Sequence, residues 1–424
     1  MRRSLHWRSA LVFGAVLPFA MGAVSLPLAA AQAETSTATS PAATQPTKQA
    51  KEEAKRLVAL GDQYAKGKDV QQDERKAADY YAKAAELGDP TGQLRFGETL
   101  VYGRGIGVDR ERGVSLMEAA VQGGSSAAMV ALGDVIARGL AGPVDAKRAI
   151  DLYERAAAEG QAVALVKLGA LYENGALVKK SSAKAADYYR KAIAADRADA
   201  MVALGRGLVE GRLKGQGSPA EGIDLLKKAQ ERGNENAVLA LSDAYFNGKG
   251  VARSPRKALA LLKQAWEGGN TRAGLRLVAL YRDGRSKSVS PNPRRAEAYL
   301  NDVSPKLSES EKAGERLMLD VKQAITRSQR LAAWKTFSGL SAADQTALIR
   351  RVYATDKNVY VFFVQSELNE RGLLKHRPTG VLSGATVRAI YKNCTGYEDA
   401  AVCRKGPLTP RVVETTSFLF HGAT

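Results

Sequence analysis

The chain is poor in the residues that catalytic and metal sites most often use. Its 424 residues include two cysteines and three histidines, and no HExxH, P-loop, nucleophile-elbow or CxxC pattern occurs. His6 lies in the N-terminal segment, His376 lies between two basic residues in a loop, and His421 is near the C-terminus. Carboxylates recur beside repeated glycines, whereas an active site needs one unique constellation. We therefore expect no enzyme, no metal and no cofactor.

Aromatic residues and prolines are also scarce. Aromatics make up 6% of the chain and there are 14 prolines, while 45% of the residues are hydrophobic and 25% are charged. This balance favours close-packed helices over a β-sandwich. The formal net charge of +19 bears on solubility and on partners, not on the fold.

The N-terminus has the pattern of a secretory signal peptide. Arg2, Arg3 and Arg8 precede an apolar run from Ala10 to about Leu28, and Ala-Gln-Ala ending at Ala33 supplies a small-x-small cleavage site. The pattern predicts a signal peptide over residues 1–33 that is cleaved after Ala33. The alternative is a permanent N-terminal membrane anchor.

The rest of the chain fits an exported protein. Residues 34–50 are rich in Ser, Thr, Pro and Ala and predict a disordered linker. No later segment is apolar enough to span a bilayer, so we expect a bacterial periplasmic location. In that compartment Cys394 and Cys403, nine positions apart, are expected to form a disulfide. It would close a loop in a tail over 395–424.

A glycine pattern divides the chain into repeats. Successive glycines 36 residues apart mark the first five units, and the register continues at Ser242 and Val278; these glycines are Gly61, Gly97, Gly133, Gly169 and Gly205. A second glycine follows about six residues after each register position. Seven units with this period indicate a solenoid, in which each unit needs its neighbours to bury its apolar face.

Each unit contains two helical patterns. In the unit around Gly133, the stretch VALGDVIARG starting at Val130 predicts a first helix that Gly139 ends. The stretch AKRAIDLYERAAAEG predicts a second amphipathic helix that Gly160 ends. The glycine of the first helix and the alanines of the second are small, so neighbouring helices can approach closely.

Leu239–Asn270, LALSDAYFNGKGVARSPRKALALLKQAWEGGN, and Leu94–Ser125 resemble the SEL-one-like repeat, a relative of the tetratricopeptide repeat. The resemblance implies a right-handed α-solenoid of about seven 36-residue helix-turn-helix repeats over residues 51–303. It further implies a protein that binds other proteins and organises complexes. Exported members of the family are often tied to cell-envelope processes, including exopolysaccharide export and its regulation. The last unit is atypical, as terminal repeats often are.

The segment after the repeats differs. Residues 304–336 are rich in helix formers, and Leu307–Trp334 predicts one long helix that caps or bridges the solenoid, with Ser308 and Glu311 as a capping box. Residues 337–394 resemble a small peptidoglycan-binding helical module. The matching positions include Gln365, Gly372, Gly380 and Thr386, whereas Thr379 stands where that family prefers Asp. The alternative is a structural or partner-docking helical domain.

Basic residues suggest a binding groove on the first helices. Arg95, Lys167 and Arg276 share one position in their repeats and would meet an acidic partner if that face lines a groove. The alternative is a solvated surface that keeps the protein soluble. The signal peptide argues against nucleic acid, which leaves an acidic polysaccharide, anionic lipid head groups or an acidic protein face. Tyrosines also recur in the first helices, and packing is a better explanation for them than sugar stacking; they are Tyr64, Tyr172, Tyr245 and Tyr281.

The sequence thus predicts an all-α, non-enzymatic periplasmic scaffold. Its expected partners are periplasmic or membrane-associated envelope proteins, with a role in exopolysaccharide synthesis, secretion or regulation and a tether to the cell wall. The alternative is a direct glycan-binding protein whose ligand is peptidoglycan or an anionic polysaccharide.

Overall fold

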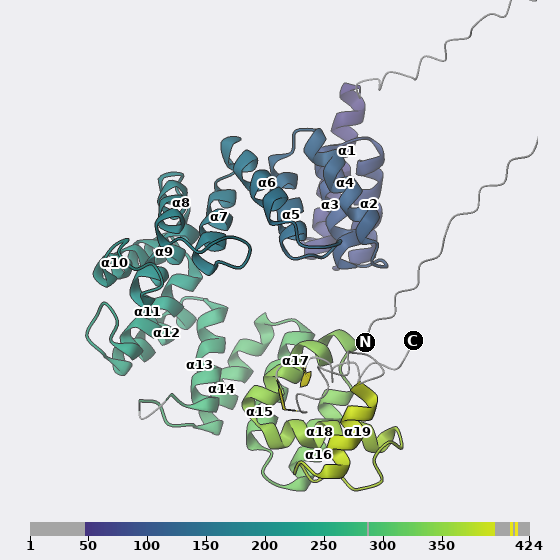
Figure 1. The fold of residues 1–424 in the computed structure, drawn as a ribbon, viewed down its shortest axis with the longest axis vertical. Helices are drawn as coiled ribbons and strands as arrows, with labels where there is room; N and C mark the ends of the chain where they lie inside the picture. The colour runs from purple at the N-terminus through teal and green to yellow at the C-terminus, as the bar shows by residue number, and fades with distance from the viewer. Residues whose placement is uncertain (1–46, 286–287, 395–407, 410–411, 414–424) are drawn as a thin grey trace, which may run out of the picture. The chain divides into compact units, whose positions relative to one another are not determined.

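The computed structural model describes residues 47–285, 288–394, 408–409 and 412–413. Across these residues the chain forms nineteen α-helices, one short 3-10 helix and no β-strand (Figure 1), so the predicted all-α solenoid class is confirmed. The expected signal peptide lies outside the described residues, as does all but the end of the expected linker. Among the described helices, none combines the length and the apolar character that a bilayer crossing requires.

Fourteen helices form seven successive pairs, and we call the first helix of each pair helix A and the second helix B. The pairs are α1 (Lys48–Lys66) with α2 (Glu74–Glu86), α3 (Pro90–Tyr102) with α4 (Arg110–Gln122), α5 (Ser126–Ala137) with α6 (Ala146–Ala158), α7 (Ala162–Asn174) with α8 (Ser182–Ala194), α9 (Ala198–Glu210) with α10 (Pro219–Glu231), α11 (Glu235–Asn247) with α12 (Pro255–Glu267), and α13 (Thr271–Asp283) with α14 (Pro293–Val303). The expected linker, 34–50, therefore ends inside α1.

The ends of these helices follow the local sequence. Six helices A are followed by a glycine with φ between 62° and 74°, a left-handed conformation that glycine adopts without steric cost; they are Gly67, Gly103, Gly139, Gly175, Gly211 and Gly248. Every helix B begins after a side chain that accepts a hydrogen bond from a backbone amide of its first turn. These caps are Asp73, Asp109, Asp145, Ser181, Ser218, Ser254 and Asn292.

The register glycines let helix A and helix B touch. In repeats one, three and four a helix-B tyrosine ring lies on the glycine, and an added Cβ would lie 2.5–2.8 Å from that ring; the pairs are Gly61 with Tyr81, Gly133 with Tyr153 and Gly169 with Tyr189. In repeats two and five the contact is between two glycines, Gly97 with Gly113 and Gly205 with Gly222. Helices A also pack on the helices A of adjacent repeats, including α1 on α3, α9 on α11 and α11 on α13.

The expectation of one long helix over Leu307–Trp334 is wrong. The chain forms a 3-10 turn (Ser304–Lys306), then α15 (Glu309–Gln323) and α16 (Arg327–Ser338). The Ser308–Glu311 capping box is present, as expected. A second capping box, between Thr326 and Gln329, begins α16 as a new helix. In a continuous helix the backbone amides of these residues would donate to carbonyls one turn earlier, but here the two side chains accept those hydrogen bonds instead.

The C-terminal helices share one hydrophobic core. It is built from α15, α16, α17 (Ala342–Thr355), α18 (Lys357–Glu370) and α19 (Gly384–Cys394). Helix α18 is buried on almost every side from Val359 to Gln365. Trp334 and Phe337 of α16 pack against Phe363 with ring centroids 5.5 and 5.0 Å away. The expected bridging segment, 304–336, therefore contributes α15 and α16 to the same core as 337–394. Val412 and Val413 of the tail are also buried in it.

Candidate functional site

Each of the three predicted groove cations pairs with a carboxylate on the preceding helix A. We call the residue that recurs every 36 or 37 positions, such as Gly61, Gly133 or Ser242, the register position. The carboxylate is the residue directly after it, and the cation is two residues before the register position of the next repeat. The pairs are Arg95 Nε with Asp62 at 3.6 Å, Lys167 Nζ with Asp134 at 2.7 Å, and Arg276 with Asp243 at 2.7 Å. We call this arrangement a clasp. The cations lie on α3, α7 and α13, so the structure does not gather them into one site, and their role toward an acidic partner stays a prediction.

Two of the clasps include the tyrosine that packs on the register glycine. The Tyr81 hydroxyl donates to Asp62 at 2.7 Å, and the Tyr153 hydroxyl donates to Asp134 at 2.6 Å. Burial, and then the hydrogen bond to the carboxylate, raise the pKa of both phenols, so each stays protonated and donates. Burial alone would raise the pKa of Asp62, but Tyr81, Arg95 and Lys66 together bring it below its usual value. Three of the recurring carboxylates, Asp62, Asp134 and Asp243, thus hold adjacent repeats together.

The fourth repeat shows a substitution that the sequence reasoning missed. The residue after Gly169 is Ala170, which cannot form a clasp. Glu173, one turn later and only 5% exposed, accepts a hydrogen bond from Tyr189 at 2.7 Å and pairs with Arg212. Tyr189 occupies the position of Tyr81 and Tyr153 without a carboxylate beside its glycine, and this mismatch is the signal from which Glu173 could have been found.

Asp134→Ala is expected to lower the free energy of unfolding by about 2 kcal/mol, because it leaves the buried Tyr153 hydroxyl and the Lys167 ammonium without their acceptor. Urea denaturation followed by circular dichroism measures the change. Asp151→Ala is the control, since Asp151 is exposed on α6 and pairs with Arg155 one turn away on the same helix; it should change stability by less than about 0.5 kcal/mol. Equal effects of the two substitutions would contradict the clasp.

The recurring tyrosines of helix A mostly pack inside their repeats. Three of them stack on a helix-B tyrosine with centroids 5.6–5.7 Å apart, and these pairs are Tyr64 with Tyr80, Tyr172 with Tyr188 and Tyr281 with Tyr299. A lysine ammonium also lies over each ring of the first two pairs, and an arginine lies over Tyr281. The fourth, Tyr245, has the ammonium of Lys257 over its ring. These ring faces serve contacts within the repeat, which supports packing over sugar stacking.

The structure brings together three of the four predicted glycan-module residues. The Gln365 amide oxygen accepts hydrogen bonds from the backbone amides of Thr379 and Gly380, both at 2.8 Å. Its nitrogen donates to the Val381 carbonyl at 2.9 Å and to the Thr386 hydroxyl at 3.0 Å. All the hydrogen-bonding groups of this buried amide are therefore used inside the module.

The remaining predicted residues lie elsewhere. Gly372 follows α18 with φ +71° and does not join the Gln365 cluster. Cys394 is buried at the end of α19, but Cys403 lies outside the described residues, so their disulfide stays a prediction. Within the described part of the chain, no three His, Cys, Asp or Glu side chains are grouped as metal ligands.

Comparisons with known proteins place the repeats in a family. The profile of the Sel1 repeat matches seven segments that together cover more than half of the chain: 57–89, 90–125, 126–161, 162–196, 198–234, 236–270 and 273–301. A search of curated proteins gives no significant match.

Several solved structures resemble the chain. A protective antigen of uropathogenic Escherichia coli with an SLR fold is 21% identical over 87% of this chain and 84% of its own, with a TM-score of 0.41. A Sel1 repeat protein from Oxalobacter formigenes is 25% identical over 52% of this chain and 90% of its own, with a TM-score of 0.43. An immunity protein from Pseudomonas aeruginosa is 19% identical over 62% and 86%, with a TM-score of 0.35. On the strength of its seven matched repeats, the chain belongs to the Sel1-repeat family.

Proposed function

We propose that the chain is a non-enzymatic scaffold that binds envelope proteins through its repeats. Sel1 repeats are generally protein-interaction scaffolds. The observation that best supports the proposal is that the register positions and the variable positions of the repeats have different roles. Glycines, tyrosines and carboxylates at the register positions are used to hold helices together, which leaves the positions that vary between repeats to select a partner.

We place this scaffold in the periplasm and connect it with exopolysaccharide synthesis, secretion or regulation. The support is the signal-peptide pattern of residues 1–33 and the resemblance to exported members of the family. A tether to the cell wall through the C-terminal module rests on the resemblance of residues 337–394 to peptidoglycan-binding modules. The internal use of Gln365 and Thr386 makes direct glycan binding the weaker candidate.

The proposal is tested in the native host with an affinity-tagged chain. After mild cross-linking of intact cells, the wild type is expected to enrich the same envelope proteins reproducibly, and its purified N-terminus is expected to be Glu34. Gln365→Leu, which perturbs only the C-terminal module, should leave this enrichment unchanged. A wild-type protein that is cytoplasmic, or that yields no enriched protein, would overturn the proposal.

The wall tether has its own test. The purified protein is mixed at low salt with insoluble peptidoglycan and sedimented. Co-sedimentation that Gln365→Leu abolishes would support a tether through the module. A protein that remains in the supernatant removes the tether without affecting the scaffold.

A further inference from the structure

Three of the six junctions between successive helices A have the clasp, and the junction between α9 and α11 differs from all the others by a reversal of charge. The residue after the register position is acidic in four repeats and alanine in two, but it is a cation in repeat five; in chain order these residues are Asp62, Glu98, Asp134, Ala170, Arg206, Asp243 and Ala279. The facing position on α11, where a clasp would have its cation, is Ala240. We call the junction between α9 and α11, with Arg206 on one side and the buried Ala240 on the other, a slot. Arg206 stands there where four repeats have an acid and two have alanine, and no side chain of α11 pairs with it.

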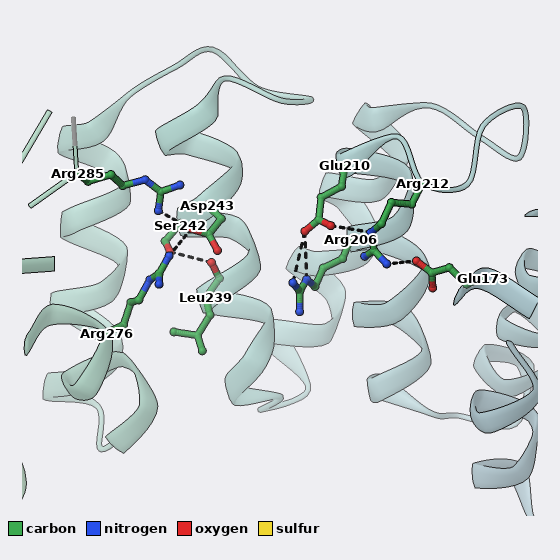
Figure 2. Close-up of polar contacts among 9 residues, drawn as sticks. All are labelled: Glu173, Arg206, Glu210, Arg212, Leu239, Ser242, Asp243, Arg276 and Arg285. Atoms are coloured by element: carbon green, nitrogen blue, oxygen red, sulfur yellow. Dashed lines mark hydrogen bonds and ion pairs between the residues drawn. The ribbon is translucent and has the colours of Figure 1, made fainter. Parts of the chain in front are cut away.

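Arg206 is weakly held by the chain itself. Its side chain is 50% exposed, and its contact with Glu210 one turn away on α9 is 3.4 Å long. Glu210 is bound more closely by Arg212, at 2.7 Å, and Arg212 also pairs with the buried Glu173. Figure 2 shows the Arg206 guanidinium beside this group. Arg206 donates from Nε and Nη2 to Oε1 of Glu210, while Arg212 binds Oε2 of the same carboxylate. Glu210 is therefore shared between two guanidinium groups, and Arg206 retains N–H donors for another carboxylate.

The adjoining slot between α11 and α13 is also rich in positive charge. Asp243 accepts hydrogen bonds from two arginines, Arg276 at 2.7 Å and Arg285 at 2.6 Å (Figure 2). The Nε of Arg276 is buried without a hydrogen-bond acceptor in the described structure. At the two slots, the three arginines Arg206, Arg276 and Arg285 pair with two carboxylates, those of Glu210 and Asp243. A ligand that supplies carboxylates would balance this charge.

We propose that the slot between α9 and α11 docks an acidic segment of a partner protein, with a partner carboxylate bound by Arg206 in the place of the missing acid. The inference rests on the proposed scaffold function and names the chemistry of its partner. Charge complementarity selects this occupant, since a guanidinium binds a carboxylate through two parallel hydrogen bonds. The neighbouring guanidiniums of Arg276 and Arg285 extend the attraction to further acidic side chains of the same segment.

The test uses a fluorescein-labelled peptide of eight glutamates, titrated with the purified protein at low salt and followed by fluorescence anisotropy. Arg206→Ala is expected to weaken binding about tenfold, the loss of one charge-assisted contact. Arg155→Ala is the matched control. Arg155 is 51% exposed and pairs with Asp151 one turn away at 3.5 Å, as Arg206 does with Glu210, but it lies on a helix B. It should leave affinity unchanged.

A second variant rebuilds the clasp. Arg206→Asp together with Ala240→Arg introduces the charges found at Asp62 and Arg95, and the variant, once shown to be folded by circular dichroism, should lose peptide binding at least tenfold. Retained binding by this folded variant would overturn the inference. Equal losses in Arg206→Ala and Arg155→Ala, no peptide binding at all, or binding of oligogalacturonate instead of the peptide would do so too.

The capture of envelope proteins in cells distinguishes a failure of the slot inference from a failure of the scaffold proposal. If envelope proteins are still enriched by the Arg206→Ala chain as by the wild type, the slot inference fails and the scaffold stands. If the wild type enriches none, the proposed function fails, whatever the peptide does.

Discussion

Gly222→Val is expected to lower the free energy of unfolding by about 3 kcal/mol. Gly222 on α10 and Gly205 on α9 form one of the glycine-glycine contacts between helices A and B. A Cβ on Gly222 would lie 2.6 Å from the Gly205 carbonyl oxygen and 2.9 Å from a methyl group of Val209. The carbonyl belongs to the backbone, so relief requires the two helices to separate. That separation also reduces the packing of Leu226, which is fully buried.

Urea denaturation followed by circular dichroism at 222 nm measures this loss. Gly107→Ala is the control, because Gly107 is exposed and has no heavy atom within 4 Å of an added Cβ; its effect should stay within about 0.5 kcal/mol. If Gly222→Val is as stable as the wild type, the close approach of α9 and α10 is not required, and the packing account of the register glycines fails.

Gln365→Leu is expected to cost about 3 kcal/mol in the stability of the C-terminal module. Leucine is of similar size but has no hydrogen-bonding groups, so the amides of Thr379 and Gly380 lose their acceptor. The Thr386 hydroxyl and the Val381 carbonyl lose a donor. Leaving several buried polar groups unpaired costs more than the net value of the hydrogen bonds themselves.

Tryptophan fluorescence during denaturation measures this effect, since Trp334 is buried in the same core. Gln264→Leu on the exposed side of α12 is the control and should change little. A module whose stability is unaffected by Gln365→Leu would show that the loop over 378–386 is held by other contacts, and would free Gln365 for the glycan role that the sequence suggested.

The repeat architecture was predictable because its determinants are local. A glycine in the left-handed conformation ends most helices A, a capping side chain begins each helix B, and both signals lie in the sequence. The break between α15 and α16 was missed because strong helix formers flank it on both sides. The capping box from Thr326 to Gln329 is a short local signal, and the helix formers on both sides of it favour a continuous helix. Ile325 stands at the break and is apolar, although 81% of its surface is accessible. In the sequence the apolar pattern therefore continues across the break.

The pairing of the groove cations was harder to foresee. Arg95, Lys167 and Arg276 look like a basic stripe when their repeats are aligned, but each lies against an acid 33 residues earlier in the chain. An alignment of the repeats compares residues at the same position. It does not show a contact between two different positions in adjacent repeats, such as each acid and its cation. The constant separation of acid and cation is visible in the sequence once neighbouring helices A are known to touch. The exception at Arg206 then becomes the informative position.

The central claim, that partners bind where the repeats differ, is tested most directly by photo-cross-linking in living cells. A photoreactive phenylalanine analogue is placed at Glu210, beside Arg206 on α9, and in a second strain at Arg155 on α6. The account predicts a protein adduct from position 210 that is absent from position 155 and disappears when Arg206→Asp and Ala240→Arg are added. No protein adduct from position 210, or the same adduct from both positions, would contradict it.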